Sequence, residues 1–250
     1  MAAGRIQVGT GGWTYPPWRD NFYPAGLPHA RELEYAGQHL TGIEINATFY
    51  RRMNAASYAK WRDAVPPGFV FTLKGSRFCT NRKALGEAGE GIANFLAQGL
   101  VELGDKLGPI NWQLMDTKRF DPDEIAAFLA LLPTLHEGVP LRHAIEPRHA
   151  SFIDPAFTEL ARRAGVAVVT ADSTKYTCID ERTAPFVYAR LQNARPELET
   201  GYPDAELDAW ADKVRGWSAL GHDVFCYFIN GAKERAPAAA MALLARLNAA

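Results

Sequence analysis

Polar side chains suited to acid–base or anion-binding chemistry recur at the carboxyl ends of short apolar segments in this chain. The clearest segment, residues 42–50, reads Gly-Ile-Glu-Ile-Asn-Ala-Thr-Phe-Tyr and carries Glu44 and Asn46. The corresponding residues of the other segments are Lys74, Gln113, Glu146, Asp172, Arg190 and Asn230. If these segments are parallel strands of a barrel, their carboxyl ends meet at one face. The pattern therefore predicts one site that combines carboxylates, cations and amides.

Two carboxylates in unlike environments can divide the roles of general acid and general base. We predict that Glu146 is the acid or base and that Glu44 or Asp172 is its partner. Lys74 completes the predicted catalytic set, as an anion anchor in preference to an electrophile or a Schiff-base nucleophile. With Arg190 it would hold an anionic group. The expected substrate is a small polar metabolite, carbohydrate-like or anionic, and both isomerisation by proton transfer and glycoside-type hydrolysis fit.

Further residues near these strand ends are predicted to bind the substrate. Trp13 and Tyr15 follow the first segment, and binding pockets are commonly lined by aromatic rings with a few polar groups. Arg148 and His149 come directly after Glu146. The full predicted substrate-binding set is Arg190, Asn46, Gln113, Asn230, Trp13, Tyr15, Tyr50, Arg148 and His149.

The sequence lacks the motifs typical of metal and nucleotide sites. The six histidines form no ligand spacing, and the glycines of residues 9–12 do not fit the dinucleotide-binding pattern. We predict no metal site and no cofactor. A divalent cation held by Glu146 and Asp172 is the alternative.

Two other interpretations stay open. Buried charges need partners, so the acidic and basic side chains could pair in a network that only fills the interior, with Glu44 beside Arg190 or Lys74. The chain could also be a non-catalytic binding module for nucleic acid or a protein partner. The basic patch would then consist of Arg5, Arg51, Arg52, Lys60 and Arg62, interleaved with Tyr50 and Tyr58. The formal net charge of −1 argues against nucleic acid.

The bulk composition is typical of one large globular domain. The 250 residues are 48% hydrophobic and 22% charged. The amino terminus leads into an apolar segment without a secretory signal, and no apolar run approaches the roughly 18 residues that span a bilayer. Its three cysteines form no CxxC pair. We expect a cytoplasmic protein that does not enter membranes; the sequence does not indicate an oligomeric state.

Strand and helix patterns alternate along the chain. Strands are predicted at residues 6–9, 42–46, 69–74, 107–113, 141–146, 166–170, 186–190 and 223–229. Helices are predicted at residues 30–40, 54–64, 91–103, 122–132, 155–164, 205–220 and 237–247. The expected N-caps are Asn54, Asp121, Asp154 and Asp204. Eight such units in a single domain, residues 1–250, predict a (β/α)8 TIM barrel, with a doubly wound open sheet as the main alternative.

Side chains alternate across a strand, so Glu44 and Asn46 share one face and Ile43 and Ile45 share the other. The polar face should point into the barrel. The same alternation predicts a second group of inward side chains: Thr72, Lys74, Asn111, Gln113, Glu146, Thr170, Asp172, Tyr188, Arg190 and Asn230.

Several motifs resemble the signatures of the DUF72 (YecE-like) family. They are Gly-Thr-Gly-Gly-Trp-Thr-Tyr at 9–15, Glu-Ile-Asn-Ala-Thr-Phe-Tyr-Arg at 44–51, Phe-Thr-Leu-Lys at 71–74 and Ile-Glu-Pro-Arg-His at 145–149. Similar motifs continue to Tyr-Phe-Ile-Asn at 227–230, so the resemblance covers nearly the whole chain in order. It implies a TIM-barrel fold. It implies little about activity, because the family is named for lacking a known function. The family is only described loosely as related to sugar isomerases.

Overall fold

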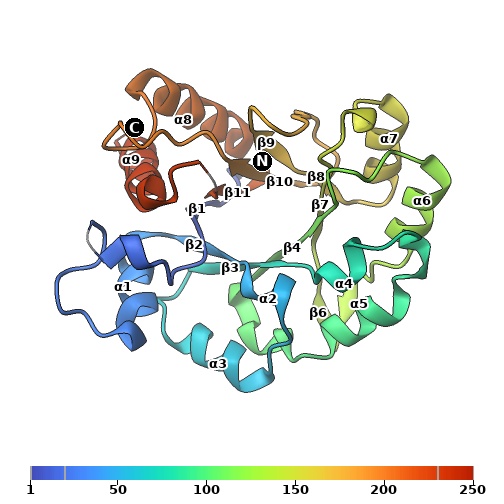
Figure 1. Ribbon diagram of the computed structural model, residues 1–250, viewed down its shortest axis with the longest axis horizontal. Coiled ribbons are helices and arrows are strands. Elements are labelled where there is room, and N and C mark those ends of the chain that lie inside the picture. The colour runs from blue at the N-terminus through green and yellow to red at the C-terminus, as the bar shows by residue number, and fades with distance from the viewer. Residues whose placement is uncertain (1, 20, 230, 250) are drawn as a thin grey trace.

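Parallel strands surrounded by helices form a barrel in the computed structural model, which describes residues 2–19, 21–229 and 231–249 (Figure 1). All neighbouring strands of the sheet are parallel, in the order β8-β7-β4-β3-β2-β1-β11-β10-β9. The strands are β1 (Ile6–Gly11), β2 (Gly42–Ile45), β3 (Val70–Lys74), β4 (Leu107–Gln113), β7 (His143–Glu146), β8 (Ala167–Val168), β9 (Thr170–Asp172), β10 (Phe186–Leu191) and β11 (Asp223–Phe228).

The two ends of the strand order meet at one short segment of chain. β8 pairs with β7 and β9 pairs with β10, and only Val169 separates β8 from β9. The Val169 amide donates a hydrogen bond to the carbonyl of Ile145, on the β7 side. The predicted sixth strand is therefore split in two, and it bridges the remaining gap in the barrel wall. The prediction of a single-domain TIM-barrel fold is confirmed.

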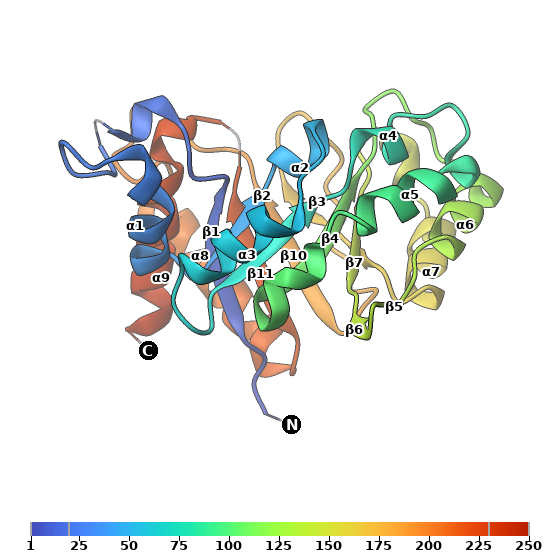
Figure 2. The same cartoon turned by 90° about the horizontal axis from the view of Figure 1, so that it is seen from below.

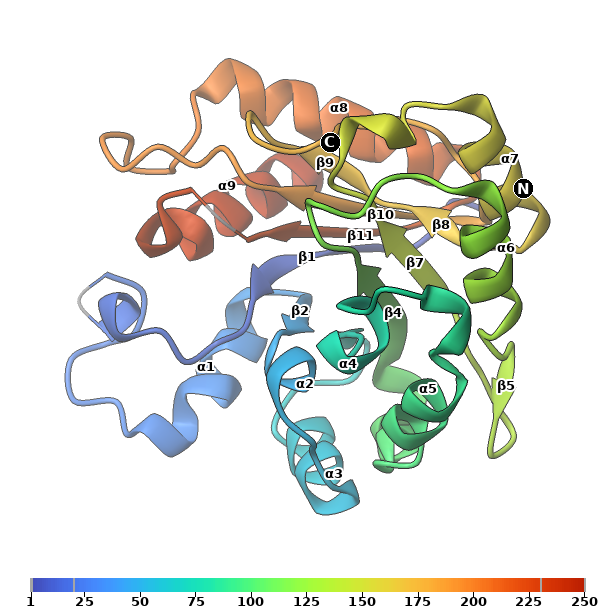
Figure 3. The ribbon, with the colours of Figure 1, turned by 45° about the vertical axis from the view of Figure 1, so that its right-hand side comes forward.

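Helices enclose the barrel wall (Figures 1 and 3). The longer helices are α1 (Glu32–His39), α3 (Ala55–Asp63), α5 (Gly89–Leu96), α6 (Pro122–Ala130), α7 (Pro155–Arg163), α8 (Asp204–Ala219) and α9 (Ala236–Asn248). The short ones are α2 (Ala47–Tyr50) and α4 (Arg77–Thr80), with 3-10 turns η1 (Pro16–Arg19), η2 (His29–Arg31), η3 (Leu85–Glu87), η4 (Leu100–Lys106), η5 (Ala150–Phe152) and η6 (Lys233–Arg235). Among the described residues, no helix is long and apolar enough to cross a membrane.

Helix starts follow the predicted capping residues in three of four cases. The side chains of Asn54, Asp121 and Asp154 accept hydrogen bonds from backbone amides at the starts of α3, α6 and α7. Asp204 is not an N-cap, because it is the first residue of α8 and Pro203 precedes it. An acidic residue there still suits the positive end of the helix dipole.

A two-stranded hairpin, which the sequence did not predict, precedes β7. It consists of β5 (Leu135–His136) and β6 (Val139–Pro140), joined by Glu137 and Gly138. Both joining residues have positive φ, 48° and 78°, which is the backbone that a tight two-residue hairpin turn needs. The hairpin shortens the predicted fifth strand, residues 141–146, to His143–Glu146.

The strands carry their carboxyl ends to one side of the barrel, the side of α2 and α4, away from the amino terminus (Figure 2). An inner cluster fills the barrel below those ends: Val70, Ala144, Ala167, Val169, Phe186, Tyr188, Phe225, Tyr227 and Ile229. Arg142 lies at the amino-terminal end of the strands. Its guanidinium is 4.8 Å from the Phe225 ring centroid and pairs with Asp223. Polar side chains at the strand ends lie above this apolar cluster, on the side of α2.

Candidate functional site

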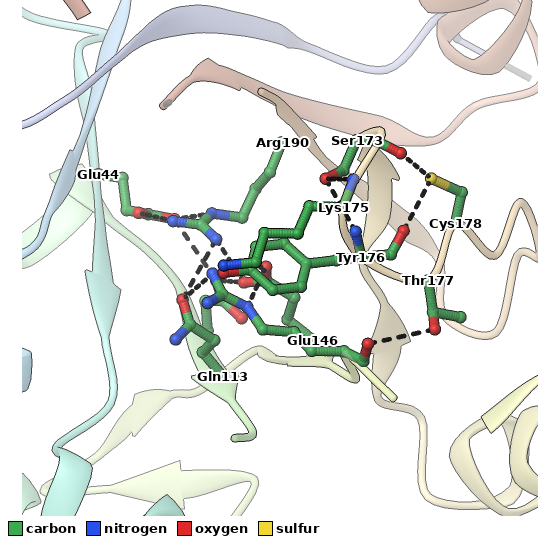
Figure 4. A network of polar contacts seen from close by, with 11 residues as sticks. Glu44, Gln113, Glu146, Ser173, Lys175, Tyr176, Thr177, Cys178 and Arg190 are labelled. Carbon is green, nitrogen blue, oxygen red and sulfur yellow. Dashed lines mark hydrogen bonds and ion pairs between the residues drawn. The ribbon is translucent and has the colours of Figure 1, made fainter. Parts of the chain in front are cut away.

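A buried arginine joins the two carboxylates that the sequence singled out. Arg190, at the end of β10, donates from Nε to Oε2 of Glu44 at 3.0 Å and from NH2 to Oε1 at 2.9 Å (Figure 4). Its NH1 group donates to Oε2 of Glu146 at 2.5 Å. All three side chains are about 1% exposed or less. Every nitrogen of the Arg190 guanidinium therefore already has a carboxylate partner.

Neutral groups complete the hydrogen bonding of Glu44. The Tyr188 hydroxyl donates to Oε2 of Glu44 at 2.7 Å and also contacts the Thr72 hydroxyl at 2.9 Å. The Asn111 amide lies 3.4 Å from Oε2 of Glu44 and 3.4 Å from Oε2 of Glu146. Buried polar groups need hydrogen-bond partners, and these contacts satisfy the carboxylate oxygens of Glu44.

A second arginine, Arg148, contacts Glu146 from the cavity side. Arg148 donates to Oε1 of Glu146 from both Nε and NH2 at 3.3 Å, and from NH2 to Oε1 of Gln113 at 2.7 Å. The Arg148 guanidinium lies over the ring of Tyr176, 4.1 Å from the ring centroid. The NH1 group of Arg148 makes no hydrogen bond with any residue that the structure describes. Arg148 thus keeps one donor group free.

The electrostatics fix the charge of Glu146. Burial alone would raise the pKa of its carboxyl group, but Arg190, Arg148 and Lys74 outweigh burial and hold that pKa below the usual value. Burial opposes the charge of Arg190, yet Glu146 and Glu44 raise the pKa of Arg190 above its usual range. Glu146 is therefore ionised near neutral pH and has no proton to donate.

Lys74, at the end of β3, differs from these paired ions. Only 7% of the residue is exposed, and its ammonium lies 4.2 Å from the ring centroid of Phe49. No described residue accepts a hydrogen bond from this ammonium, and no described carboxylate lies within 4.0 Å of it. Burial, and then the charge of Arg190, lower the pKa of Lys74 to about 8.

A cavity of about 480 Å³ opens above these residues, inside the ring of strand ends. Among the described residues that line it are five cationic side chains and no carboxylate. The cations are Lys74, Arg148 and Arg190 at its base, with Arg51 and Lys233, which are exposed. Glu44 and Glu146 lie beneath, covered by the arginines. The surface that a ligand meets is therefore positive.

Aromatic rings form the other wall of the cavity. Trp13 packs edge-on against Trp61, with ring centroids 5.4 Å apart, and Tyr15 packs edge-on against Trp18 at 5.9 Å. The Trp18 indole donates to the carbonyl of Lys233 at 2.8 Å, which ties the segment after β1 to the segment after β11. A ligand with an anionic group and an apolar surface would match both walls.

A family model with the description "Protein of unknown function DUF72" matches residues 7–250. The chain belongs to the DUF72 family. No curated protein matches it.

Solved structures resemble this DUF72 protein along its whole length. A DUF72 family protein from Thermotoga maritima MSB8 is 23% identical, with a TM-score of 0.74 over 96% of this chain and 97% of that chain. A DUF72 family protein from Enterococcus faecalis V583 is 18% identical, with a TM-score of 0.74 over 99% of both chains. A methyltransferase from Methanosarcina mazei is 10% identical, with a TM-score of 0.50 over 99% of this chain and 94% of that chain. At these identities the likeness concerns the fold alone.

Most of the predicted site residues of this DUF72 protein do converge. The cavity is lined by Lys74, Arg190, Asn46, Gln113, Trp13, Tyr15, Tyr50 and Arg148. Glu44 and Glu146 lie directly beneath, as the contacts with Arg190 show. Asn230 lies outside the described residues. Lining residues that were not predicted to contact a ligand include Phe49, Trp61 and Lys233. Phe49 lies within the motif at 44–51, but an aromatic residue there, like Trp61 in a helix, is also typical of the core.

Asp172 faces the wrong way for the predicted role. It pairs in register with Leu191, whereas Arg190 pairs with Ala171, so Asp172 and Arg190 point to opposite faces of the wall. The Asp172 carboxylate accepts hydrogen bonds from Asn193 at 2.7 Å and from the Tyr202 hydroxyl at 3.3 Å. Thr170 faces outward by the same register, since it pairs with Ala189. Asp172 therefore connects loops outside the barrel, and its carboxylate lies on the opposite face of the wall from the Arg190–Glu146 pair.

His149 does not line the cavity either. Its Nδ1 accepts a hydrogen bond from the Ser151 amide at 3.1 Å and contacts the Ser151 hydroxyl at 2.8 Å, which caps η5. No group of three or more His, Cys, Asp or Glu side chains within the described ranges could hold a metal ion.

The residues of the alternative basic patch do not form one surface. Tyr58 is fully buried and packs against Trp61. Arg62 is paired with Asp63 at 2.8 Å. Arg5 precedes β1, at the amino-terminal end of the strand, whereas Arg51 follows β2 at the opposite face. Only Tyr50 and Arg51 of that set line the cavity.

Proposed function

We propose that this DUF72 protein is an enzyme that acts on a small anionic metabolite bound in the barrel cavity. The observation that carries this proposal is the lining, which has five cationic side chains and no carboxylate among the described residues. The site lies at the carboxyl ends of the strands, the position at which barrels of this kind hold their active sites.

The charge balance below the cavity supports an anionic ligand. Two carboxylates, Glu44 and Glu146, face three cations, Arg190, Arg148 and Lys74. One positive charge is left without a partner, and it is the ammonium of Lys74. At 4 Å, an opposite charge at an effective dielectric constant of 20 gains ~4 kcal/mol, so a ligand anion would relieve this imbalance.

Lys74 and Arg148 are the groups that would hold the anion. Within the described part of the chain, the ammonium of Lys74 has no hydrogen-bond acceptor and the NH1 group of Arg148 donates to no residue. Arg190 lacks this capacity because its three nitrogens are taken by Glu44, Glu146 and Gln113. We expected Arg190 to bind the anion; the contacts favour a different role, in which it positions the carboxylates and keeps the floor of the site rigid.

The carboxylate acid–base chemistry of an isomerase or hydrolase is less well supported. Glu146 is ionised, 1% exposed and shielded from the cavity by Arg148 and Arg190. A general acid must hold its proton at working pH, and a general base must reach the substrate within hydrogen-bonding distance. We therefore favour a reaction in which Lys74, and not a carboxylate, is the reacting side chain.

Anion binding can be tested by thermal unfolding and calorimetry with inorganic phosphate and malonate, against chloride at equal ionic strength. The wild type should gain stability from both anions at millimolar concentration; a ligand present at 100 times its Kd adds about 2.7 kcal/mol. Lys74→Met should lose that gain. Lys60→Met, the same change at an exposed lysine of α3 outside the cavity, should keep it. Equal stabilisation of all three proteins would show a general salt effect and would refute the proposal.

A further inference from the structure

We propose, building on the function proposed above, that Lys74 forms a Schiff base with an aldehyde or ketone group of the anionic substrate. The substrate class is a small carbonyl compound that carries a carboxylate or a phosphate. Arg148 would hold the anionic group through its free NH1, and Lys74 would act on the carbonyl carbon.

The geometry gives Lys74 the freedom that a nucleophile needs. It ends β3, where Phe49 packs against its ammonium, and it lines the cavity. Thr48 fixes the backbone at this point by donating from its hydroxyl to the Lys74 carbonyl at 2.7 Å. The base of the side chain is thus held in the wall, while the amine faces the space that a substrate would enter.

Other lysines with polar partners show how unusual this arrangement is. Lys106 donates to the carbonyls of Arg62 and Val65, both at 2.6 Å. Lys118 pairs with Glu124 at 2.8 Å and bonds a carbonyl. Each of those two ammonium groups donates two hydrogen bonds to protein acceptors, which is typical of a structural role. Lys74 is nearly as buried as a core residue, yet its amine has no acceptor among the described residues. An ammonium that the fold leaves unsatisfied costs stability, which selection tolerates where function needs it.

The electrostatics agree with this geometry. Only the neutral amine attacks a carbonyl carbon, and burial with the nearby Arg190 charge lowers the pKa of Lys74 to about 8. Roughly one molecule in ten then carries a neutral Lys74 at pH 7, against roughly one in three thousand for an ordinary lysine. Glu44 and Glu146 act in the opposite direction and raise this pKa, but burial and the charge of Arg190 outweigh them.

The chemistry balances without a further reactant. The lone pair of Nζ attacks the carbonyl carbon, a C–N bond forms, and the π electrons of the C=O bond move to the oxygen, which takes a proton from the nitrogen. The oxygen of the resulting carbinolamine takes a second proton from solvent and leaves as water, and the nitrogen lone pair forms the C=N bond of a positively charged iminium. This iminium withdraws electrons from the neighbouring carbon, so it activates that carbon for loss of a proton or cleavage of a C–C bond.

Trapping by reduction tests this proposal. The protein is incubated at pH 7.5 with pyruvate, 2-oxoglutarate or glyceraldehyde 3-phosphate, reduced with sodium borohydride, digested, and mapped by mass spectrometry. Borohydride delivers hydride to the iminium carbon and leaves a stable secondary amine on the lysine. With at least one of the three probes, Lys74 should be labelled about tenfold more than any other lysine, as its larger neutral fraction requires. Inorganic phosphate should compete.

Two matched variants separate a nucleophile from an anchor. Lys74→Arg keeps a positive charge but cannot form the imine, so it should lose the label while retaining stabilisation by phosphate. Lys233→Arg changes another lysine of the same cavity and should keep the label at Lys74. If Lys74→Arg fails to fold, Lys74→Met serves as the unlabelled variant.

The outcomes also separate this proposal from the one on which it rests. If phosphate stabilises the wild type but none of the three probes labels Lys74, the Schiff base is refuted and the anion site stands. If phosphate gives no stabilisation and no label appears, both proposals are wrong. Equal labelling of Lys74 and Lys233 shows reaction with surface amines only and also overturns the Schiff base.

Discussion

Arg190 holds Glu44 through two parallel hydrogen bonds, and Lys74 has no carboxylate partner among the residues that the structure describes. Both cations project inward, Lys74 from β3 and Arg190 from β10, which three strands separate in the sheet order, and Glu44 is one of two carboxylates within their electrostatic range. The planar guanidinium matches a carboxylate in two places, whereas an ammonium acts as a single point charge. Arg190 therefore takes the carboxylates, and Lys74 becomes the group that is available to a ligand.

The first prediction concerns the stability of the buried network. Arg190→Leu removes the partner of two carboxylates that are 1% exposed or less, and breaking a buried ion pair costs about 3–5 kcal/mol. Urea unfolding at pH 7 should show a loss of that size. Arg163→Leu is the control, because Arg163 pairs with Glu159 at the surface and such pairs contribute ~0.5 kcal/mol. Similar losses in the two variants would mean that the network does not hold the barrel.

The second prediction is that Lys74→Met is more stable than the wild type at pH 7. The pKa of Lys74 falls from 10.5 in the unfolded chain to about 8 in the fold, so folding disfavours the protonated side chain. A shift of this size corresponds to ~3 kcal/mol as an upper bound, and about 1–3 kcal/mol is expected.

The sign of the pH dependence follows from the same shift. Between about pH 8 and 10.5 the unfolded chain binds more protons at Lys74 than the folded protein does, so this residue makes wild-type stability rise with pH. The advantage of Lys74→Met should shrink over this range and be absent above it. Chemical unfolding at pH 7, 9 and 10.5 measures the difference in unfolding free energy between Lys74→Met and the wild type, with Lys60→Met as the control. A less stable Lys74→Met variant at pH 7 would contradict the predicted desolvation of the amine.

Much of this site could be predicted from the sequence. Where polar and apolar residues alternate along a strand, the pattern shows which side chains point into the barrel. Glu44 lies between Ile43 and Ile45, and its inward direction is confirmed by its contact with Arg190. Alternation fails at residues 166–171, Val-Ala-Val-Val-Thr-Ala, which are nearly all apolar. A strand that is buried on both faces carries no such signal, so the orientation of Asp172 could not be predicted.

The pairing of the charges could be predicted only in part: Glu44 was expected beside Arg190 or Lys74 in the alternative of an interior network, and the structure pairs it with Arg190. The same residues were expected in the site, but sequence gives no distances across a barrel, and the partner of Arg190 depends on how far each strand extends. Glu146 was expected to act as an acid or base because it ends a strand next to Arg148. In the structure, that proximity is what removes the acid function, because Arg148 and Arg190 keep the carboxyl group ionised.

The third prediction uses the lowered pKa of Glu146. Its carboxyl group contributes stability that is present above the ordinary glutamate pKa and is lost as the pH falls through the lower value in the fold. The difference in unfolding free energy between wild type and Glu146→Gln should therefore be largest near pH 7 and smaller in acid. Glu90→Gln, an exposed change in α5, should follow the wild-type curve. A constant difference across pH would show that Glu146 is not an ionised partner of the arginines.

The last prediction tests whether the close approach of β1 to Asn46 shapes the cavity. A Cβ atom added at Gly11 would lie 2.7 Å from the Asn46 amide nitrogen and 3.0 Å from Cδ1 of Ile229, and all three residues line the cavity. Gly11→Ala should therefore displace the Asn46 side chain, which can move at low cost, and weaken phosphate binding about tenfold with less than ~1 kcal/mol lost in stability. Gly216→Ala, in α8 where a Cβ meets nothing, should bind phosphate like the wild type and gain ~0.5–1 kcal/mol of stability. Calorimetric titration of both variants decides the matter, and unchanged binding in Gly11→Ala would exclude Asn46 from the ligand site.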